Sequence, residues 1–307
     1  MRLPFTLALA GDVMLGRGVA QALGGDWEAA FAEVQPWLAE ADLAFANLES
    51  PLTTAPLPPS VPPIGGDEGG AYDLRAPPEA VTALHVAGFD AVSLVNNHAL
   101  DAGEAGLRET VNTLSAAGIA PLVGWETGTL VNWETGTSPS RSPVHQSTDY
   151  QSARLPTCHL LAFDDSVAPL DLEAAAEAVA AAAEQADVVI VSIHWGGEYQ
   201  AAPSPRQRAI ARMLADARAR LIVGHGPHVL QRVEWVGDTL VAYSLGNFLF
   251  DQPYPAGCRR GAILRVTLQG DRIIAVGAVP TVVERSRVVL AGLEDAAAIL
   301  ARLNLQP

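Results

Sequence analysis

The amino-acid sequence predicts an α/β protein that forms a single domain over residues 1–307. Three observations support this prediction. Hydrophobic residues make up 49% of the chain, which is enough for one large core. Apolar runs of strand length alternate with helical patterns over the first two thirds of the chain, and the last third consists mostly of strands separated by turns. No linker composition divides these two parts into separate domains.

Helices are predicted where apolar residues recur at helical spacing or where strong helix formers cluster. The predicted helical ranges are 26–40, 78–87, 103–117, 171–186 and 204–219, with a short helix after Gly292. In the first range, Asp26 is the expected N-cap and Pro36 the expected position of a kink.

Buried strands are predicted where short apolar runs end in polar or glycine-containing loops. The predicted strands of the front part are 3–10, 42–46, 119–123, 160–165 and 187–193, with further strands just before Asn96 and just before His225. Towards the C-terminus, Gly237-Asp238 and Gly270-Asp271 predict hairpin turns in a mostly antiparallel part.

Two segments lack the periodicity of a helix or a strand. Residues 51–78 are rich in proline and glycine and are expected to form a surface loop. Residues 124–157 repeat the motif WETGT eight positions apart and are otherwise rich in Ser, Thr, Pro and Gly. We expect them to form an irregular insertion.

Charge and cysteine usage exclude several classes of function. The net charge is −15, from 34 acidic and 19 basic residues, which disfavours binding to nucleic acid or to an anionic membrane surface. Only two cysteines, Cys158 and Cys258, are present, so neither a disulfide framework nor a thiolate zinc site is expected. The first apolar run is too short for a signal peptide, and no run is long enough to span a membrane. The expected location is cytoplasmic.

Polar side chains follow five of the predicted strands. They are Asp12, Asn47, Glu49, Asn96, Asn97, His98, Asp101, His194, His225 and His228. In open α/β sheets, functional sites gather outside the carboxyl ends of the strands, so these five loops are expected to converge. Nitrogen and oxygen donors suit Zn, Mn or Fe, and two such ions about 3.5–4 Å apart can activate water and hold a phosphoryl group.

Each of these residues also has a structural interpretation. Asp12 could form a turn after its strand, and Asn96 and Asn97 could likewise form a turn. Asn47 and Glu49 could be cap residues. A single histidine after a strand, such as His194, is more often a hydrogen-bonded loop residue than a ligand. His225 and His228, three positions apart, favour ligation even when taken alone. Convergence of the loops favours a functional interpretation for the whole set. The remaining histidines are interpreted as structural (His85), as packing or edge (His159), or as part of the insertion (His145).

Six stretches in this order resemble the CapA-type (poly-γ-glutamate capsule biosynthesis) branch of the metallophosphoesterase superfamily. The stretches are GDVMLGRGV, ANLESPLT, NNHALDAG, SIHWGGEY, GHGPHVLQ and YSLGNFLFDQ, and the resemblance extends from residue 8 to about residue 251. It implies a two-sheet αββα sandwich with helices on the outside. It also implies one or two divalent metal ions, of Mn, Zn or Fe.

The resemblance also implies roles for individual residues. Asp12 and His228 would hold a first metal ion, and Asn97, His194 and His225 a second. Glu49 would bridge the two ions, with Asn47 as the alternative. His98 would protonate the leaving oxygen or orient the substrate. Asp101 and Glu198 are either residues that orient a histidine or ordinary loop charges.

One position departs from the family pattern. Met14 stands where the family's first block has a histidine, so the first metal would lose a nitrogen ligand and one-metal binding remains open. Arg17, in the same loop, would contact an anionic substrate or fill part of that gap.

The expected function is a metal-dependent hydrolase that acts on a phosphomonoester or phosphodiester and is related to capsule biosynthesis proteins. Two alternatives remain. The chain could be a non-catalytic metal-binding protein that binds poly-γ-glutamate or helps to assemble or export it. It could also be a hydrolase of γ-amide bonds. A fold alone does not choose among these functions.

Overall fold

The computed structural model describes residues 3–57, 73–124, 131–133 and 156–305. Much of the predicted loop at 51–78 and most of the predicted insertion at 124–157 lie outside these ranges. Within the insertion, Val131–Trp133 form a short strand, β5, that pairs antiparallel with the next strand of the chain.

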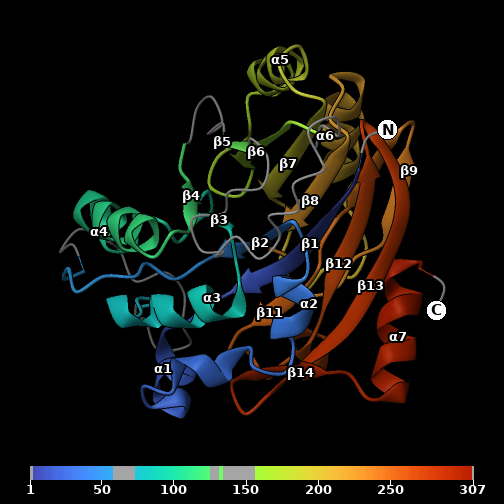
Figure 1. Cartoon of the computed structure of the whole chain (residues 1–307). Coiled ribbons are helices and arrows are strands. Elements are labelled where there is room, and N and C mark those ends of the chain that lie inside the picture. Colours follow the sequence, from blue (N-terminus) through green and yellow to red (C-terminus); the bar gives the residue numbers. More distant parts are fainter. Residues whose placement is uncertain (1–2, 58–72, 125–130, 134–155, 306–307) are drawn as a thin grey trace, which may run out of the picture.

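The first sheet combines parallel strands from the front of the chain with antiparallel strands from its end (Figure 1). Its strand order is β14 (Arg287–Leu290), β13 (Arg272–Glu284), β12 (Arg260–Gln269), β1 (Pro4–Val13), β2 (Leu43–Leu48), β3 (Ala91–Ser93) and β4 (Ala120–Leu122). Strand β11 (Asn247–Leu249) lies off this path and pairs in parallel with β1.

The second sheet is built around three parallel strands from the middle of the chain. Its order is β5, β6 (Cys158–Asp164), β7 (Val188–His194), β8 (Leu221–His225), β10 (Thr239–Ala242) and β9 (Val233–Val236). The parallel pairing aligns Asp164, His194 and His225 across β6, β7 and β8, so these three side chains reach the same edge of the sheet.

The two sheets pack face to face around a shared apolar core, which confirms the predicted αββα sandwich. That core joins side chains of β1 and β12 in the first sheet to side chains of β7 and β8 in the second. Along β1, Leu7 and Leu9 belong to the core between the sheets, whereas Ala8 and Ala10 belong to the core beneath the outer helices. This alternation is the two-residue period of a strand that is buried on both faces.

Helices cover the outer faces of both sheets, and Figure 1 shows α1 to α4 gathered on one side and α5 and α6 on another. The last helix, α7, instead packs against β12 and β13 and joins the core between the sheets. The helices are α1 (Arg17–Leu23), α2 (Gln35–Ala39), α3 (Val81–Ala87), α4 (Gly103–Ala116), α5 (Leu172–Ala183), α6 (Pro205–Asp216) and α7 (Leu293–Leu303). Short 3-10 turns occur at η1 (Trp27–Ala30), η2 (Pro78–Ala80) and η3 (Ala256–Arg259).

Local sequence signals explain where several helices begin and end. The Asp171 side chain accepts hydrogen bonds from the first backbone amides of α5, and Ser204 and Gln207 form a reciprocal capping box on α6. Gly88 ends α3 with a positive φ of 89°, a conformation that glycine adopts without steric cost.

The helix predicted over 26–40 is wrong as one continuous element. The segment forms the 3-10 turn η1 and then the separate helix α2, in which Pro36 lies in the first turn. Proline has no backbone N–H to donate, so it suits the start of a helix and not its interior. Asp26 precedes η1 but its side chain makes no capping hydrogen bond there.

The last third of the chain departs from the expected antiparallel pattern at two strands. The hairpins at Gly237-Asp238 and Gly270-Asp271 are confirmed, since β9 pairs antiparallel with β10 and β12 with β13. However, β10 runs parallel to β8 in the second sheet, and β11 runs parallel to β1 in the first. Between these two strands the chain crosses from one sheet to the other, which brings Asn247 beside Asp12.

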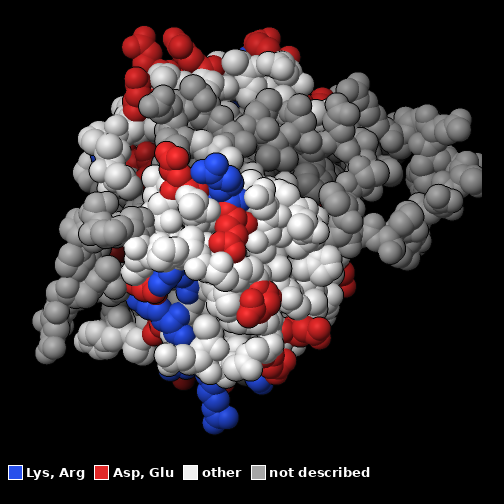
Figure 2. All heavy atoms as spheres, turned by 90° about the vertical axis from the view of Figure 1, so that its left-hand side faces the viewer, with Lys and Arg blue, Asp and Glu red and all other residues white. Residues whose placement is uncertain are grey.

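Charged side chains lie in small groups of both signs on the face shown in Figure 2, so that face presents no broad basic field. Among the described residues, no helix combines the length and the apolar character that crossing a membrane requires.

Candidate metal centre

Carboxylates from the first sheet and histidines from the second meet at the carboxyl ends of their strands. Asp12 lies near the end of β1, and Glu49 directly follows β2. His194 and His225 are the last residues of β7 and β8, and His228 lies in the loop after β8. All five side chains are buried, although every one of them is polar. The structure therefore brings together five of the six predicted ligands.

Asp12 is the hub of this cluster. Its Oδ1 accepts a hydrogen bond from Asn47 Nδ2 at 3.0 Å and lies 3.1 Å from His225 Nδ1. Its Oδ2 lies 3.3 Å from His228 Nδ1 and accepts from the Gly226 amide at 3.3 Å. Burial by itself raises the pKa of this carboxyl, but the hydrogen bonds to His225 and His228 outweigh it and hold the pKa well below its usual range. Asp12 is therefore ionised at neutral pH.

Glu49 has one engaged oxygen and one unpaired oxygen. Its Oε1 accepts from Asn47 Nδ2 at 3.0 Å and lies 3.3 Å from His194 Nε2. Its Oε2 is buried without a hydrogen-bond partner and lies 3.9 Å from His228 Nε2. Burial raises the pKa of Glu49, but the nearby charge of His228 helps to lower it below its ordinary value. Asn47, the alternative bridging residue, donates to both carboxylates and so holds them in position.

Two histidines offset these charges in the metal-free protein. Burial lowers the pKa of His194, but hydrogen bonds to Asp164 and Glu49 outweigh it and raise the pKa to about 10. Burial also lowers the pKa of His228, but the charges of Glu49 and Asp12 and a hydrogen bond to Asp12 raise it to about 9. Both imidazoles are consequently protonated at neutral pH, and a divalent cation would displace those protons.

The donor set fits a divalent metal ion. Asp12, Glu49 and His228 each offer a ligand atom, and these atoms lie within 4.8 Å of one another. His225 Nε2 is also buried without a hydrogen-bond partner. Because the ionised Asp12 carboxylate can only accept, His225 Nδ1 carries the hydrogen of their contact, and Nε2 is the nitrogen left without a partner. Buried polar atoms without partners are rare, and an ion bound by this group would satisfy Glu49 Oε2.

Asn97, the sixth predicted ligand, lies elsewhere. It is exposed, and its Nδ2 is 3.1 Å from His98 Nε2. The neighbouring Asn96 is the buried one: its Nδ2 donates to Asn47 Oδ1 at 3.0 Å and to the Leu48 carbonyl at 2.9 Å. Sequence reasoning missed this link between the third loop and the cluster, because nothing in the sequence distinguishes two adjacent asparagines in a turn.

His98 and Asp101 form a buried pair beside the cluster. His98 Nδ1 lies 3.0 Å from Asp101 Oδ2, and the His98 backbone amide donates to Asn96 Oδ1 at 3.0 Å. Asp101 thus orients the His98 ring, and Asn96 connects the His98 backbone amide to Asn47. Glu198, the other candidate orienting residue, is exposed.

Arg17 and Met14 occupy different environments although they share a loop. The Met14 side chain is buried in the apolar core, and its sulfur accepts a hydrogen bond from the Gly16 amide at 3.1 Å. The Arg17 side chain is paired with Asp251 and lies 5.8 Å from the centre of the Phe250 ring, which in turn contacts the His228 ring at 5.1 Å. Arg17 therefore approaches the cluster from the Phe250 side.

Further polar residues support the histidines, and sequence reasoning did not assign this role to Ser166 or Asp164. Ser166 Oγ lies 3.0 Å from His194 Nδ1, and Asp164 Oδ1 lies 3.6 Å from the same nitrogen. Asn247 Oδ1 lies 2.9 Å from His228 Nδ1. Asp164 at the end of β6 follows the same positional rule as His194 and could have been found by it.

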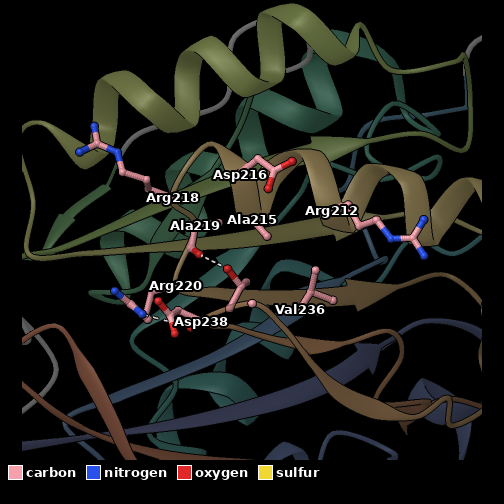
Figure 3. Close-up of a pocket in the computed structure, with 10 residues that line it drawn as sticks. Arg212, Ala215, Asp216, Arg218, Ala219, Arg220, Val236 and Asp238 are labelled. Atoms are coloured by element: carbon pink, nitrogen blue, oxygen red, sulfur yellow. Dashed lines mark hydrogen bonds between the residues drawn. The ribbon is translucent and has the colours of Figure 1, made fainter.

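Two hollows lie near the strands that carry the histidines. One, of about 400 Å³, is lined by residues 165–169 together with Gly196, Gly197 and Arg206, and it adjoins the cluster through the Ser166–His194 contact. The other, of about 500 Å³, lies at the opposite end of β8 beside Arg220 and Thr239 (Figure 3). Only the first can belong to the same site as the histidines.

The αββα sandwich with buried carboxylates and histidines at its strand ends places this chain in the class of metallophosphoesterase-like folds. Within that class, the chain belongs to the family of bacterial capsule synthesis proteins called PGA_cap, whose family model matches residues 6–252.

Two curated relatives are similar over most of this chain. The PGA biosynthesis protein CapA of Bacillus subtilis (strain 168) is 31% identical over 261 residues, which cover 80% of this chain and 63% of that protein. The capsule biosynthesis protein CapA of Bacillus anthracis is 31% identical over 267 residues, covering 80% of this chain and 60% of that protein. The chain thus spans less than two thirds of the length of these relatives.

A solved structure supports the fold. The crystal structure of a phosphatase from Mycoplasma pneumoniae matches 92% of this chain and 95% of its own, with a TM-score of 0.55 and 11% sequence identity. At that identity the similarity establishes the architecture and carries no information about the reaction.

Proposed function

We propose that this chain is a divalent-metal-dependent hydrolase of phosphoesters that is related to capsule biosynthesis proteins. The observation that supports this proposal best is the buried group of Asp12, Glu49 and His228, whose ligand atoms lie within 4.8 Å of one another while Glu49 Oε2 has no hydrogen-bond partner. Isolated buried polar atoms cost free energy, on the order of 1–3 kcal/mol each, so a structure keeps them only where something compensates.

Asp12, Glu49, His194, His225 and His228 would hold one or two metal ions, with Asn47 fixing both carboxylates. An ion bound there would polarise a phosphoryl oxygen and offset the negative charge that develops on it. With Met14 buried in the core, one nitrogen donor of the family pattern is missing, so a single strongly bound ion is the simpler expectation. Asn97 stays a predicted ligand that would have to turn inward from the surface.

His98 would supply the proton to the leaving oxygen. Its Nδ1 is held by Asp101, so Nε2 would exchange a proton with the substrate once the Asn97 amide has turned away from it. Asp251 orients Arg17, whose guanidinium would receive a non-bridging oxygen of the substrate. The hollow beside Ser166 and Arg206 would take the remainder of the substrate molecule.

Turnover of a generic phosphoester, such as p-nitrophenyl phosphate or its bis ester, tests this proposal. The wild-type protein, loaded with Mn²⁺, is compared with His98→Ala, and His85→Ala serves as the matched control because His85 is exposed on α3. We expect His98→Ala to lower kcat roughly 100-fold or more while metal content stays the same. Turnover that is unchanged in His98→Ala, or that is absent from metal-loaded wild type, would contradict the proposed mechanism.

The names of the relatives favour a second candidate function. Because both are named for PGA or capsule biosynthesis, the same site could bind carboxylates of poly-γ-glutamate without hydrolysing a phosphoester. Binding of the polymer by the metal-loaded protein without turnover would support this function. Release of glutamate from the polymer would instead indicate cleavage of γ-amide bonds.

A further inference from the structure

A chain of hydrogen bonds leads from the surface to His228. The Tyr199 hydroxyl accepts from Gln252 Nε2 at 3.3 Å, and Gln252 Oε1 accepts from Asn247 Nδ2 at 3.1 Å. Asn247 Oδ1 then lies 2.9 Å from His228 Nδ1. Three segments distant in sequence, after β7, after β8 and at β11, are connected by this chain.

When a metal ion displaces one proton of His228, the order of donors along this chain determines which nitrogen keeps its hydrogen. Because Asn247 uses its amide hydrogens toward Gln252, its carbonyl oxygen faces the histidine as an acceptor. His228 Nδ1 must therefore donate, and Nε2 is the nitrogen that faces Glu49 Oε2 at 3.9 Å. A metal ligand histidine commonly has its other nitrogen held by a hydrogen bond in this way.

Asn247 also affects how strongly Asp12 Oδ2 is engaged by His228. His228 Nδ1 lies 3.3 Å from Asp12 Oδ2, so without Asn247 the histidine would donate only to that carboxylate. With Asn247 as the nearer acceptor, at 2.9 Å, His228 donates less strongly to Asp12 Oδ2, which leaves this oxygen more of its capacity to bind a cation. One amide thus presents two candidate ligand atoms at once.

The surroundings of Asn247 and His228 leave little freedom of movement. Asn247 is fully buried and aligned with Asp12 in the parallel pairing of β11 with β1. Its backbone carbonyl oxygen lies so close to Gly261 that a Cβ at that glycine would approach it to 2.3 Å. His228 has a positive φ of 58°, an uncommon conformation for a residue other than glycine, and its ring lies between those of Phe250 and Tyr199.

We propose that Asn247 is a positioning residue of the metal centre, which fixes His228 with Nε2 directed at the ion, and that Gln252 is the outer link that orients Asn247. This inference rests on the proposed metal centre and extends it to residues outside the ligand set. It applies whether the ion serves hydrolysis or polymer binding.

Metal affinity tests this inference without reference to turnover. Titration calorimetry with Mn²⁺, and the visible absorption spectrum with Co²⁺, are compared for wild type, Asn247→Ala, Asn247→Asp and Gln252→Ala. Asn112→Ala is the matched control because Asn112 is an exposed residue of α4. Thermal melts of the metal-free proteins show whether each variant is folded.

We expect Asn247→Ala to weaken metal binding roughly 10- to 100-fold and to alter the Co²⁺ spectrum. Asn247→Asp keeps an acceptor for His228 Nδ1 and should bind within a few-fold of wild type. Gln252→Ala should show a smaller loss than Asn247→Ala, and Asn112→Ala none. If Asn247→Ala does not fold, the inference is judged by the other two variants: Gln252→Ala should bind the metal more weakly than wild type, and Asn247→Asp should keep its affinity.

Two results would overturn the inference: affinity and Co²⁺ spectrum of Asn247→Ala equal to those of wild type, or Asn247→Asp as weak as Asn247→Ala when both are folded. Absence of metal binding by the wild-type protein is a different result. It would reject the proposed metal centre itself, and the role of Asn247 with it.

Discussion

The two ends of β8 carry charged residues in different ways. At the carboxyl end, His225 is buried and faces Asp12 of the other sheet, and its Nε2 has no hydrogen-bond partner. At the amino end, Arg220 donates to the Asp238 carbonyl at 3.1 Å and Arg218 pairs with the exposed Glu184. Figure 3 shows the guanidinium groups of Arg212 and Arg218 pointing outward on opposite sides of the hollow. The two ends do not differ in whether they carry charged residues or a hollow nearby. They differ because the charged side chains at the carboxyl end are buried and include an atom without a hydrogen-bond partner.

The largest expected difference between the two ends concerns an aspartate at each. Asp12→Ala removes the hub of the buried cluster and leaves His228 with less opposing charge, so we expect the free energy of unfolding to fall by about 3 kcal/mol or more in EDTA. Asp216→Ala, in the exposed hollow at the other end, should leave the urea midpoint unchanged. Equal effects of the two substitutions would break the comparison.

A steric change at the carboxyl end should have a somewhat smaller effect. A Cβ at Gly11 would come within 1.9 Å of the Gly246 carbonyl oxygen, at the place where the chain crosses beside β1. We expect Gly11→Ala to cost roughly 1–3 kcal/mol, with weaker metal binding because Asp12 moves. Gly277→Ala on β13 meets nothing within 4 Å and is the control. A Gly11→Ala protein that unfolds at the wild-type urea concentration would show that this contact relaxes freely.

Sequence reasoning located the carboxyl end but not its internal connections. Asp12, Glu49, His194, His225 and His228 follow apolar strands, and the rule that strand ends converge brings them together without any knowledge of contacts. The partner of Asn247 could not be found in this way, because its contact with His228 depends on the crossing of the chain from the second sheet to the first, which periodicity does not reveal. Asn96 is buried and Asn97 is exposed because the turn directs their side chains differently, and two adjacent asparagines do not reveal that direction in the sequence. The break between η1 and α2 depends on Pro36. A proline can kink a helix or begin a new one, and the sequence alone does not distinguish these two effects.

The pH dependence of stability provides a finer test of the carboxyl end. The pKa values of His194 and His228 are raised to about 10 and about 9, so their protonation stabilises the metal-free fold fully below the ordinary value of 6.5. That stabilisation is lost as pH rises through the raised values. We therefore expect the thermal midpoint in EDTA to fall between about pH 6.5 and 10.

Two comparisons isolate the histidines in this experiment. The fall should be smaller in His228→Gln, which cannot take up the proton. It should also be smaller when excess Mn²⁺ replaces the protons of the cluster. A wild-type midpoint that stays level or rises over this range of pH would contradict the assigned protonation.

The smallest expected effect is at the amino end of β8. Arg212→Ala and Arg218→Ala change exposed side chains of the hollow in Figure 3 and should alter neither Mn²⁺ affinity nor phosphoester turnover. Calorimetry and a turnover assay check this expectation. A loss of metal affinity or of turnover in these variants would mean that residues of the hollow influence the histidine cluster, and would contradict the comparison.

Metal content per chain tests the central claim most directly. The protein is purified without chelator, reloaded with Mn²⁺ or Zn²⁺ and subjected to elemental analysis beside a His225→Ala/His228→Ala double variant. We predict one or two ions per wild-type chain, lost in the double variant, with a single ion if the position of Met14 leaves one site without a donor. A wild-type metal content no higher than that of the variant would contradict the assignment of this cluster as a metal centre.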